Sequence, residues 1–293
     1  MKLNEMCGTG VAIITPFQEN GSIDFSALER MINHVIEGGV QNIVTLGTTG
    51  EVPTLSIDEK KEIIRFTIKK VNKRVPVIAG IGGNNTKEIV YQLNSFPLED
   101  VAAILSVAPY YSKPSPEGLY QHYKAVSKAS PKPVILYNVP GRTAITIPAE
   151  IVLRLARDFE NIVGVKDATG DLALGMDIIR QKPEDFTVVS GDDLLTMPQI
   201  SIGMEGVISV AANIYPEEIS ELVRLTRKQN FAEARKIQYK LLPAMKYMFK
   251  ENSPAGVKAF LETAGLIQEQ LRLPVVPVSK DLKENIRQYF AKN

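Results

Sequence analysis

The chain has 293 residues, enough for two ordinary domains or for one large α/β domain. Hydrophobic residues make up 44% and charged residues 23%, and the formal net charge is +1 without a long run of one sign, so neither nucleic acid nor a membrane is expected as a partner. The single cysteine, Cys7, excludes an internal disulfide and a multi-cysteine metal site.

Neither the first residues nor the apolar segments indicate export. Residues 1–8 lack a basic start followed by an apolar run, so we expect no signal peptide. No window approaches the roughly 18 uninterrupted apolar residues of a membrane span. The protein is therefore expected to be cytoplasmic. The two histidines, His34 and His122, lie far apart in predicted helices, and we assign neither to a metal.

Short apolar segments alternate with amphipathic segments up to about residue 215. The predicted strands cover residues 10–17, 42–47, 75–81, 101–107, 133–139, 161–168, 186–190 and 206–211. Helices are predicted between them, the first after an N-cap at Asp24 and the second after a capping box at Ser56 and Glu59. The strands are rich in Val and Ile, as expected for parallel strands covered on both faces. This alternation predicts a closed (β/α)₈ TIM barrel, since an open doubly wound sheet would be expected to carry a Gly-rich dinucleotide fingerprint.

After Tyr215 the pattern becomes helical. Helices are predicted over residues 216–228, 231–249, 253–264 and 281–291. This is more helix than one barrel repeat needs. We therefore predict a catalytic barrel over residues 1–225 and a C-terminal helical domain over residues 226–293.

Lys166 stands where the sixth predicted strand ends. A buried ammonium is costly, so a lysine here must be paired, hydrated or used in chemistry. Only a neutral amine attacks a carbonyl, which makes Lys166 a candidate Schiff-base nucleophile. The alternative is a strand-end lysine whose head reaches solvent. Alternation predicts Ile162, Gly164 and Lys166 inside the barrel, and Val163 and Val165 against the helices.

Tyr137 is the expected partner of Lys166 on the fifth strand. Alternation places Ile135, Tyr137 and Val139 on one face. If that face is inward, the Tyr137 hydroxyl lies beside the strand of Lys166 and can donate and accept protons during imine chemistry. The alternative is a core tyrosine with a satisfied hydroxyl.

Two further strand ends suit a substrate that carries carboxylates. The turn at residues 47–51 (GTTGE) exposes backbone N–H groups and the hydroxyls of Thr48 and Thr49. Arg142 offers a bidentate fork for a second carboxylate, or is a surface arginine. The acidic residues at 167, 192 and 193 lack the neighbours of a divalent metal site, so no metal is expected.

Taken together, these motifs resemble the pyruvate-dependent class I aldolases of the dihydrodipicolinate synthase and N-acetylneuraminate lyase superfamily. The matching motifs are GTTGE at 47–51, YNVP at 137–140 and GVKD at 164–167. Order and spacing agree from residues 10–17 to 273–274. Within the superfamily, three further motifs are similar to the dihydrodipicolinate synthase family: PYY at 109–111, GRT at 141–143 and SGDD at 190–193. Neuraminate lyases usually lack the arginine at that point.

The resemblance implies that pyruvate condenses with aspartate 4-semialdehyde, in lysine and diaminopimelate biosynthesis, without a metal or an organic cofactor. Lys166 would form the imine with pyruvate. Tyr137, Thr49 and Tyr111 would form a proton relay, with Tyr111 reaching into the site of a neighbouring subunit. The family is usually a homotetramer, a dimer of dimers.

The same resemblance assigns the substrate contacts. The backbone groups of Thr48 and Thr49 would hold the pyruvate carboxylate, and Arg142 the carboxylate of the semialdehyde. The Ile208 carbonyl and Gly191 would line the pocket.

Lysine-inhibited members of the family bind lysine at a feedback site that Asn84, Glu88 and Tyr110 match. Their site often includes histidines in the helix after the second strand. Residues 52–60 have an isoleucine and Lys60 at these points, and a cationic Lys60 disfavours the ammonium of the ligand. We therefore predict weak or absent lysine feedback.

Two alternative functions are open. The first keeps the imine chemistry with another aldehyde, as in an N-acetylneuraminate lyase or a keto-sugar-acid aldolase. Arg142 argues against this, because a sugar-specific site would prefer groups that bind hydroxyls. The second is a non-catalytic barrel that acts as a regulator or scaffold, which the joint presence of Lys166, Tyr137 and Thr49 disfavours.

Overall fold

The computed structural model describes residues 7–292. The prediction that the chain carries no signal peptide concerns residues that lie almost entirely outside this range. Within the described part, no helix is both long enough and apolar enough to cross a membrane.

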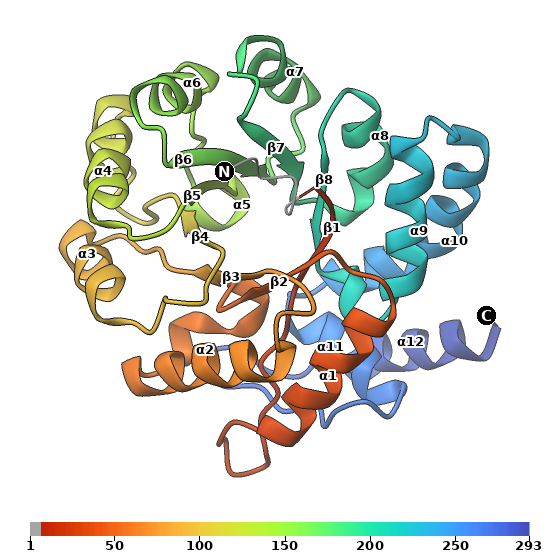
Figure 1. Ribbon diagram of the computed structural model, residues 1–293. Coiled ribbons are helices and arrows are strands. Elements are labelled where there is room, and N and C mark those ends of the chain that lie inside the picture. Colours follow the sequence, from red (N-terminus) through yellow and green to blue (C-terminus); the bar gives the residue numbers. More distant parts are fainter. Residues whose placement is uncertain (1–6, 293) are drawn as a thin grey trace.

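Eight parallel strands close into a barrel in chain order, with β8 pairing back to β1 (Figure 1). The strands are β1 (Gly8–Ala12), β2 (Asn42–Thr45), β3 (Val77–Gly80), β4 (Ala103–Val107), β5 (Val134–Asn138), β6 (Ile162–Asp167), β7 (Thr187–Ser190) and β8 (Gly206–Ser209). The predicted (β/α)₈ barrel is confirmed. Its polar strand ends therefore meet at one face, as parallel connectivity requires.

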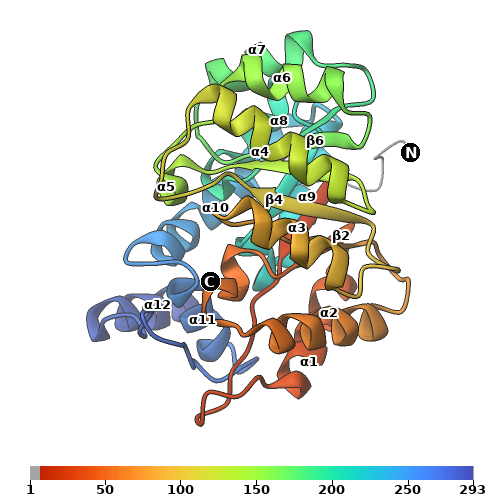
Figure 2. The same ribbon diagram turned by 90° about the vertical axis from the view of Figure 1, so that its left-hand side faces the viewer.

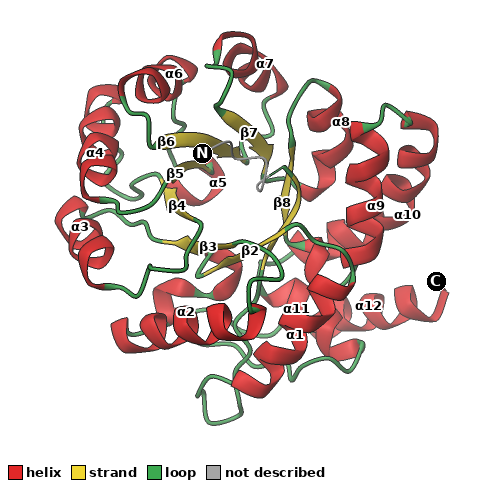
Figure 3. Cartoon of the chain, in the orientation of Figure 1, coloured by secondary structure: helices red, strands yellow, loops and turns green. Residues whose placement is uncertain are grey.

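Helices surround the strands as an outer ring (Figure 3). They are α1 (Phe25–Glu37), α2 (Ile57–Val71), α3 (Thr86–Ser95), α4 (Pro116–Ala129), α6 (Ala149–Asp158), α7 (Leu172–Gln181), α8 (Thr196–Ser201) and α9 (Pro216–Arg227). The short helix α5 (Pro140–Thr143) lies inside this ring, next to β5. The predicted caps are present. The Asp24 carboxylate accepts the Ala27 N–H at the start of α1, and Ser56 and Glu59 form the capping box of α2.

Three helices follow the barrel: α10 (Phe231–Phe249), α11 (Ala255–Thr263) and α12 (Lys280–Lys292). They lie together at one side of the molecule (Figure 2) and pack on one another. The predicted C-terminal helical extension is therefore present. The predicted domain boundary after residue 225 falls within α9, which is the last barrel helix and ends at Arg227. The division into two domains stays a prediction.

The barrel interior is filled by an inner cluster to which only strands and their ends contribute. Its buried members are Ala12, Val44, Ile78, Ala103, Leu105, Ile135, Tyr137, Val139, Val189 and Ile208. Two larger clusters join the outer faces of the strands to the helices. Ile135, Tyr137 and Val139 thus share the inward face that alternation predicted.

Strand β6 contains a bulge that alternation does not reveal. Two neighbouring residues of β5 pair with Ile162 and Gly164, so Val163 is an extra residue. Ile162 packs in the outer core with Val165, whereas Val163 packs against the inner cluster. The predicted directions of Ile162 and Val163 are therefore wrong. Beyond the bulge the register recovers, and Lys166 points inward as predicted, opposite the inward-facing tyrosine of β5.

Candidate active site

A cavity of about 270 Å³ opens at the carboxyl ends of the strands. Its walls include six of the residues that the sequence singles out: Thr48, Thr49, Tyr137, Arg142, Lys166 and Gly191. These residues come from the ends of β2, β5, β6 and β7 or from the loops that follow them. The parallel barrel therefore gathers into one cavity side chains that lie up to half the chain apart.

Lys166 and Tyr137 are register partners on β6 and β5. The Lys166 side chain is largely buried, with the residue 3% exposed, and its Nζ lies 4.6 Å from the centroid of the Tyr137 ring. Throughout residues 7–292, no hydrogen bond or ion pair joins this Nζ to another group. An amine in this position faces the cavity without a carboxylate to hold its charge, as a nucleophile requires.

Gly191 is required by its closeness to Lys166. A Cβ atom at position 191 would lie 2.8 Å from Lys166 Cε and 2.7 Å from Ala168 Cβ. The Gly191 N–H donates to the Asp167 carbonyl at 2.7 Å, which fixes the backbone there. Directly after β7, only glycine therefore fits beside the Lys166 side chain without displacing it.

The turn after β2 is a 3₁₀ helix, η2 (Thr48–Gly50). The first N–H groups of such a helix have no partner within it, so those of Thr48 and Thr49 are available to an anion. Thr15 Oγ1 donates to the Gly50 carbonyl at 2.8 Å and ties the turn to the segment after β1. The turn can therefore bind a small carboxylate beside Lys166.

Arg142 lies in α5, directly after β5, and its side chain forms part of the cavity mouth. Its Nη2 donates to the Ser253 carbonyl at 2.7 Å, and its Nη1 donates to Asn252 Oδ1 at 3.5 Å. The segment before α11 thus orients the guanidinium. This contact was not foreseen, since neither residue carries a recognisable signal in the sequence.

The two acidic residues after β7, Asp192 and Asp193, accept hydrogen bonds from nearby groups. Burial raises the pKa of Asp192, which lines the cavity and accepts the Leu194 N–H at 2.9 Å. Asp193 is buried, and its carboxylate accepts from Ser209 Oγ at 2.5 Å and from two N–H groups of the loop after β8. No group of three or more His, Cys, Asp or Glu side chains among the described residues could hold a metal ion.

Two predicted site residues do not line the cavity in a single chain. Tyr111 is 89% exposed and is not among the residues that line it. Ile208 belongs to the inner cluster, and the wall at the end of β8 is formed by Val210 instead. The proposed contributions of Tyr111 through a neighbouring subunit and of the Ile208 carbonyl stay predictions.

The residues matching the lysine feedback site lie on the surface between α2, α3 and the loop after β4. Asn84, Glu88 and Tyr110 are exposed. Lys60 is half-buried near them, and burial lowers its pKa while Glu88 opposes that shift. The Lys60 side chain therefore lies near Glu88, as the sequence predicted.

A closed barrel with a buried lysine beside a tyrosine at the open ends of its strands defines the class of protein: a (β/α)₈ lyase of the aldolase type. The model of the Dihydrodipicolinate synthetase family matches residues 5–292, and the chain belongs to this family. The predicted family is thus confirmed.

Individual relatives agree over nearly the whole chain. The chain is 48% identical to the 4-hydroxy-tetrahydrodipicolinate synthase of Flavobacterium psychrophilum over 95% of both proteins. Its fold matches dihydrodipicolinate synthase from Aquifex aeolicus with a TM-score of 0.95, at 38% identity and 98% coverage of both chains. It also matches the chloride-inhibited enzyme from Acinetobacter baumannii in complex with pyruvate, with a TM-score of 0.94, 40% identity and 98% coverage of both chains.

Proposed function

We propose that the protein is a 4-hydroxy-tetrahydrodipicolinate synthase that condenses pyruvate with aspartate 4-semialdehyde through an imine on Lys166. The observation that carries the proposal is the Lys166 amine, which faces the cavity next to Tyr137 without an ion-pair partner among the described residues. The proposal needs neither a metal nor an organic cofactor, because the imine itself withdraws electrons from the substrate.

The chemistry balances with the groups in the cavity. The neutral Lys166 amine attacks C2 of pyruvate, and loss of water gives the imine. Loss of a methyl proton gives the enamine, whose carbon attacks the aldehyde of the semialdehyde. The amino group of the semialdehyde then replaces the lysine nitrogen, which closes the ring and frees Lys166. Tyr137 is suited to carry the protons of these steps because its ring lies against the amine.

The two carboxylates have separate places in the cavity. The N–H groups of Thr48 and Thr49 suit the pyruvate carboxylate, since η2 adjoins Lys166 in the cavity wall. Arg142 suits the carboxylate of the semialdehyde at the mouth, where its contacts to residues 252 and 253 leave donors free. A site with two anion receptors on either side of an amine fits a reaction between two carboxylic acids.

A homotetramer built as a dimer of dimers belongs to the same proposal. Three tyrosines near α3 and the loop after β4 are exposed, Tyr91, Tyr110 and Tyr111. Exposed aromatic side chains gathered in one region favour burial by a neighbouring chain. Such a neighbour would also receive Tyr111 in its cavity and complete the relay with Thr49. A cytoplasmic location, where Cys7 stays reduced, is likewise proposed.

The test is product formation from pyruvate with aspartate 4-semialdehyde, measured beside the same assay with pyruvate and N-acetylmannosamine. We expect product with the semialdehyde only. Product with the amino sugar only would favour the lyase alternative, and no product with either aldehyde would refute the proposal. The named relatives and Arg142 both favour the synthase over the sugar-acid lyases.

A further inference from the structure

Glu51 ends the turn that carries Thr48 and Thr49. Its backbone is left-handed, with φ of 55°, and it is both the last cap of η2 and the first cap of η3 (Val52–Thr54). This conformation is uncommon for residues other than glycine and persists where surrounding contacts impose it. The contacts of the Glu51 side chain are therefore expected to help hold the turn in this conformation.

The Glu51 carboxylate is buried in a complete set of partners. Its Oε1 lies 2.5 Å from Lys258 Nζ, and the two side chains are 1% and 0% exposed. Its Oε2 accepts the backbone N–H of Arg272 at 3.1 Å. Lys258 Nζ also donates to the Gln270 carbonyl at 2.8 Å and lies 4.3 Å from the centroid of the Phe17 ring. Every charge in this pair is compensated, so the pair can exist in the interior.

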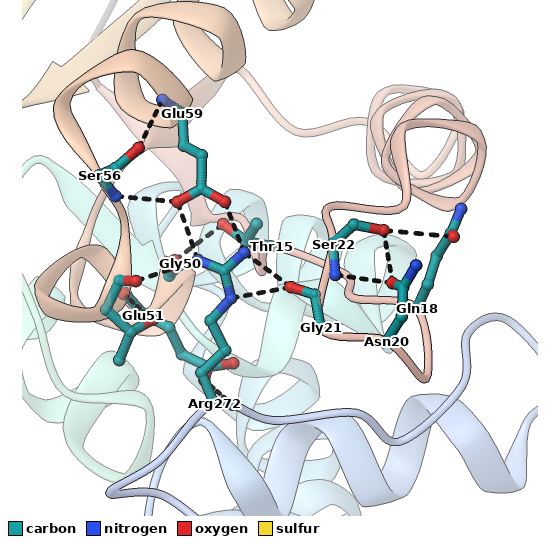
Figure 4. A network of polar contacts seen from close by, with 11 residues as sticks. Thr15, Gln18, Asn20, Gly21, Ser22, Gly50, Glu51, Ser56, Glu59 and Arg272 are labelled. Atoms are coloured by element: carbon teal, nitrogen blue, oxygen red, sulfur yellow. Dashed lines mark hydrogen bonds and ion pairs between the residues drawn. The ribbon is translucent and has the colours of Figure 1, made fainter.

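Figure 4 shows how the surrounding network continues. The Arg272 guanidinium lies between the Glu59 carboxylate and the Gly21 carbonyl, with Glu51 beside its backbone. The carbonyl of Gly50 meanwhile accepts from Thr15. The turn is thus held by side chains from the segment after β1 and from the C-terminal extension, and not from the barrel strands alone.

Helix α11 connects both halves of the substrate site. Lys258 on α11 holds Glu51 and hence the turn with Thr48 and Thr49. The Ser253 carbonyl, just before α11, holds Arg142. Helix α11 and the residues just before it therefore contact the residue behind the first anion receptor and the residue that forms the second.

We propose that Glu51 and Lys258 are positioning residues of the active site: their buried ion pair fixes the turn of Thr48 and Thr49 to α11, and so determines the affinity for the 2-oxo acid. The inference rests on the proposed function for the identity of that acid. It assigns the C-terminal extension a direct role in substrate binding, because α11 then sets the spacing between the turn and Arg142.

If the Glu51–Lys258 pair only stabilised the fold, its loss would have the same effect as the loss of any other ion pair. The ion pair of Lys182 and Glu205 serves as the control for this case. Lys182 Nζ lies 3.1 Å from Glu205 Oε1, at the amino ends of β7 and β8 and so at the opposite end of the barrel. Loss of either pair is expected to lower stability. Only loss of the Glu51–Lys258 pair should loosen the turn and weaken pyruvate binding.

The experiment compares full-length Glu51→Gln, Lys258→Met, the double variant and the control Glu205→Gln at a temperature where circular dichroism shows each one folded. Hydrogen exchange of residues 47–55 reports on the turn. Steady-state kinetics reports KM for pyruvate and kcat. For Glu51→Gln and Lys258→Met we expect about tenfold faster exchange in this segment and about tenfold higher KM for pyruvate, with a smaller change in kcat. The double variant should resemble Glu51→Gln, since both changes break the same contact.

Unchanged exchange at residues 47–55 in Glu51→Gln would overturn the inference whatever the activity. Faster exchange with an unchanged KM for pyruvate would also overturn it, and so would an equal rise of KM in Glu205→Gln. If the wild-type protein makes no product from pyruvate, the proposed function has failed instead. In that case the exchange data still decide whether the ion pair holds the turn.

Discussion

The amine of Lys166 lies over the face of the Tyr137 ring, 4.6 Å from its centroid, and not against its hydroxyl. The two residues are register partners on adjacent strands, so their separation is set by the barrel itself. The Lys166 amine makes no hydrogen bond to the Tyr137 hydroxyl within the described residues, so the hydroxyl stays available to a bound substrate. In the proposed mechanism, the phenol would therefore exchange protons with the adduct on Lys166 and not with the resting amine.

Replacing Tyr137 with Phe tests this division of roles. The ring and its packing remain, but the proton carrier is lost. We expect kcat to fall by about 10²–10⁴-fold, while pyruvate still labels Lys166 on borohydride reduction, though more slowly. Steady-state kinetics and intact-protein mass spectrometry measure the two effects. A Tyr137→Phe enzyme with wild-type kcat would remove Tyr137 from the mechanism.

Arg142→Gln should separate the two substrates. The guanidinium is held at the cavity mouth by residues 252 and 253, which make no hydrogen bond to Thr48 or Thr49. We expect KM for the semialdehyde to rise by about 10–100-fold and KM for pyruvate to change little. Initial rates with each substrate varied in turn give both constants. Equal increases in the two KM values would contradict the separate sites.

His122 predicts a pH dependence of stability. It is buried, its Nδ1 contacts Thr86 Oγ1 at 2.8 Å, and burial lowers its pKa from 6.5 to about 4. The unfolded chain therefore takes up the proton first as the pH falls. The stabilisation that the neutral, buried His122 contributes to the free energy of unfolding is fully present above pH 6.5. It is lost as the pH falls from 6.5 to 4, and amounts to about 3 kcal/mol in all.

The variant His122→Gln should lack this pH-dependent contribution to stability, while its other groups titrate as in the wild type. We expect the difference in free energy of unfolding between wild type and variant to shrink as the pH falls from 7 to 4. Denaturant unfolding followed by circular dichroism measures it. A difference that is constant over this range would show that His122 does not titrate as described.

Lysine should inhibit the enzyme weakly or not at all. Lys60 is half-buried beside Glu88, so a cation already occupies the neighbourhood that a lysine ligand would need. The activity measured with increasing lysine at fixed substrates should stay flat through the low millimolar range. A clear loss of activity at modest lysine concentration would contradict the prediction.

Much of the fold was predictable because its signals are local. Strand and helix alternation gave the barrel, and the caps at Asp24 and Ser56 gave helix starts that the structure confirms. The bulge at Val163 escaped because a valine fits either face of a strand, and only the pairing with β5 reveals the extra residue.

The candidate site was predictable as far as strand ends go. Lys166, Tyr137 and Gly191 meet because parallel strands end at one face. The contribution of the C-terminal extension was not foreseen, because nothing in a sequence pairs Glu51 with a residue 207 positions away. One signal was present. Lys258 interrupts an apolar stretch at residues 255–261, and a lysine in such a place needs a buried partner.

The most direct measurement of the central claim is borohydride reduction in the presence of pyruvate, followed by peptide mass spectrometry, for the wild-type protein and for Lys166→Ala. We predict one reduced pyruvate adduct per chain, located on Lys166, and no adduct on the variant. No adduct on the wild type, or an adduct on another lysine that persists in Lys166→Ala, would contradict the mechanism.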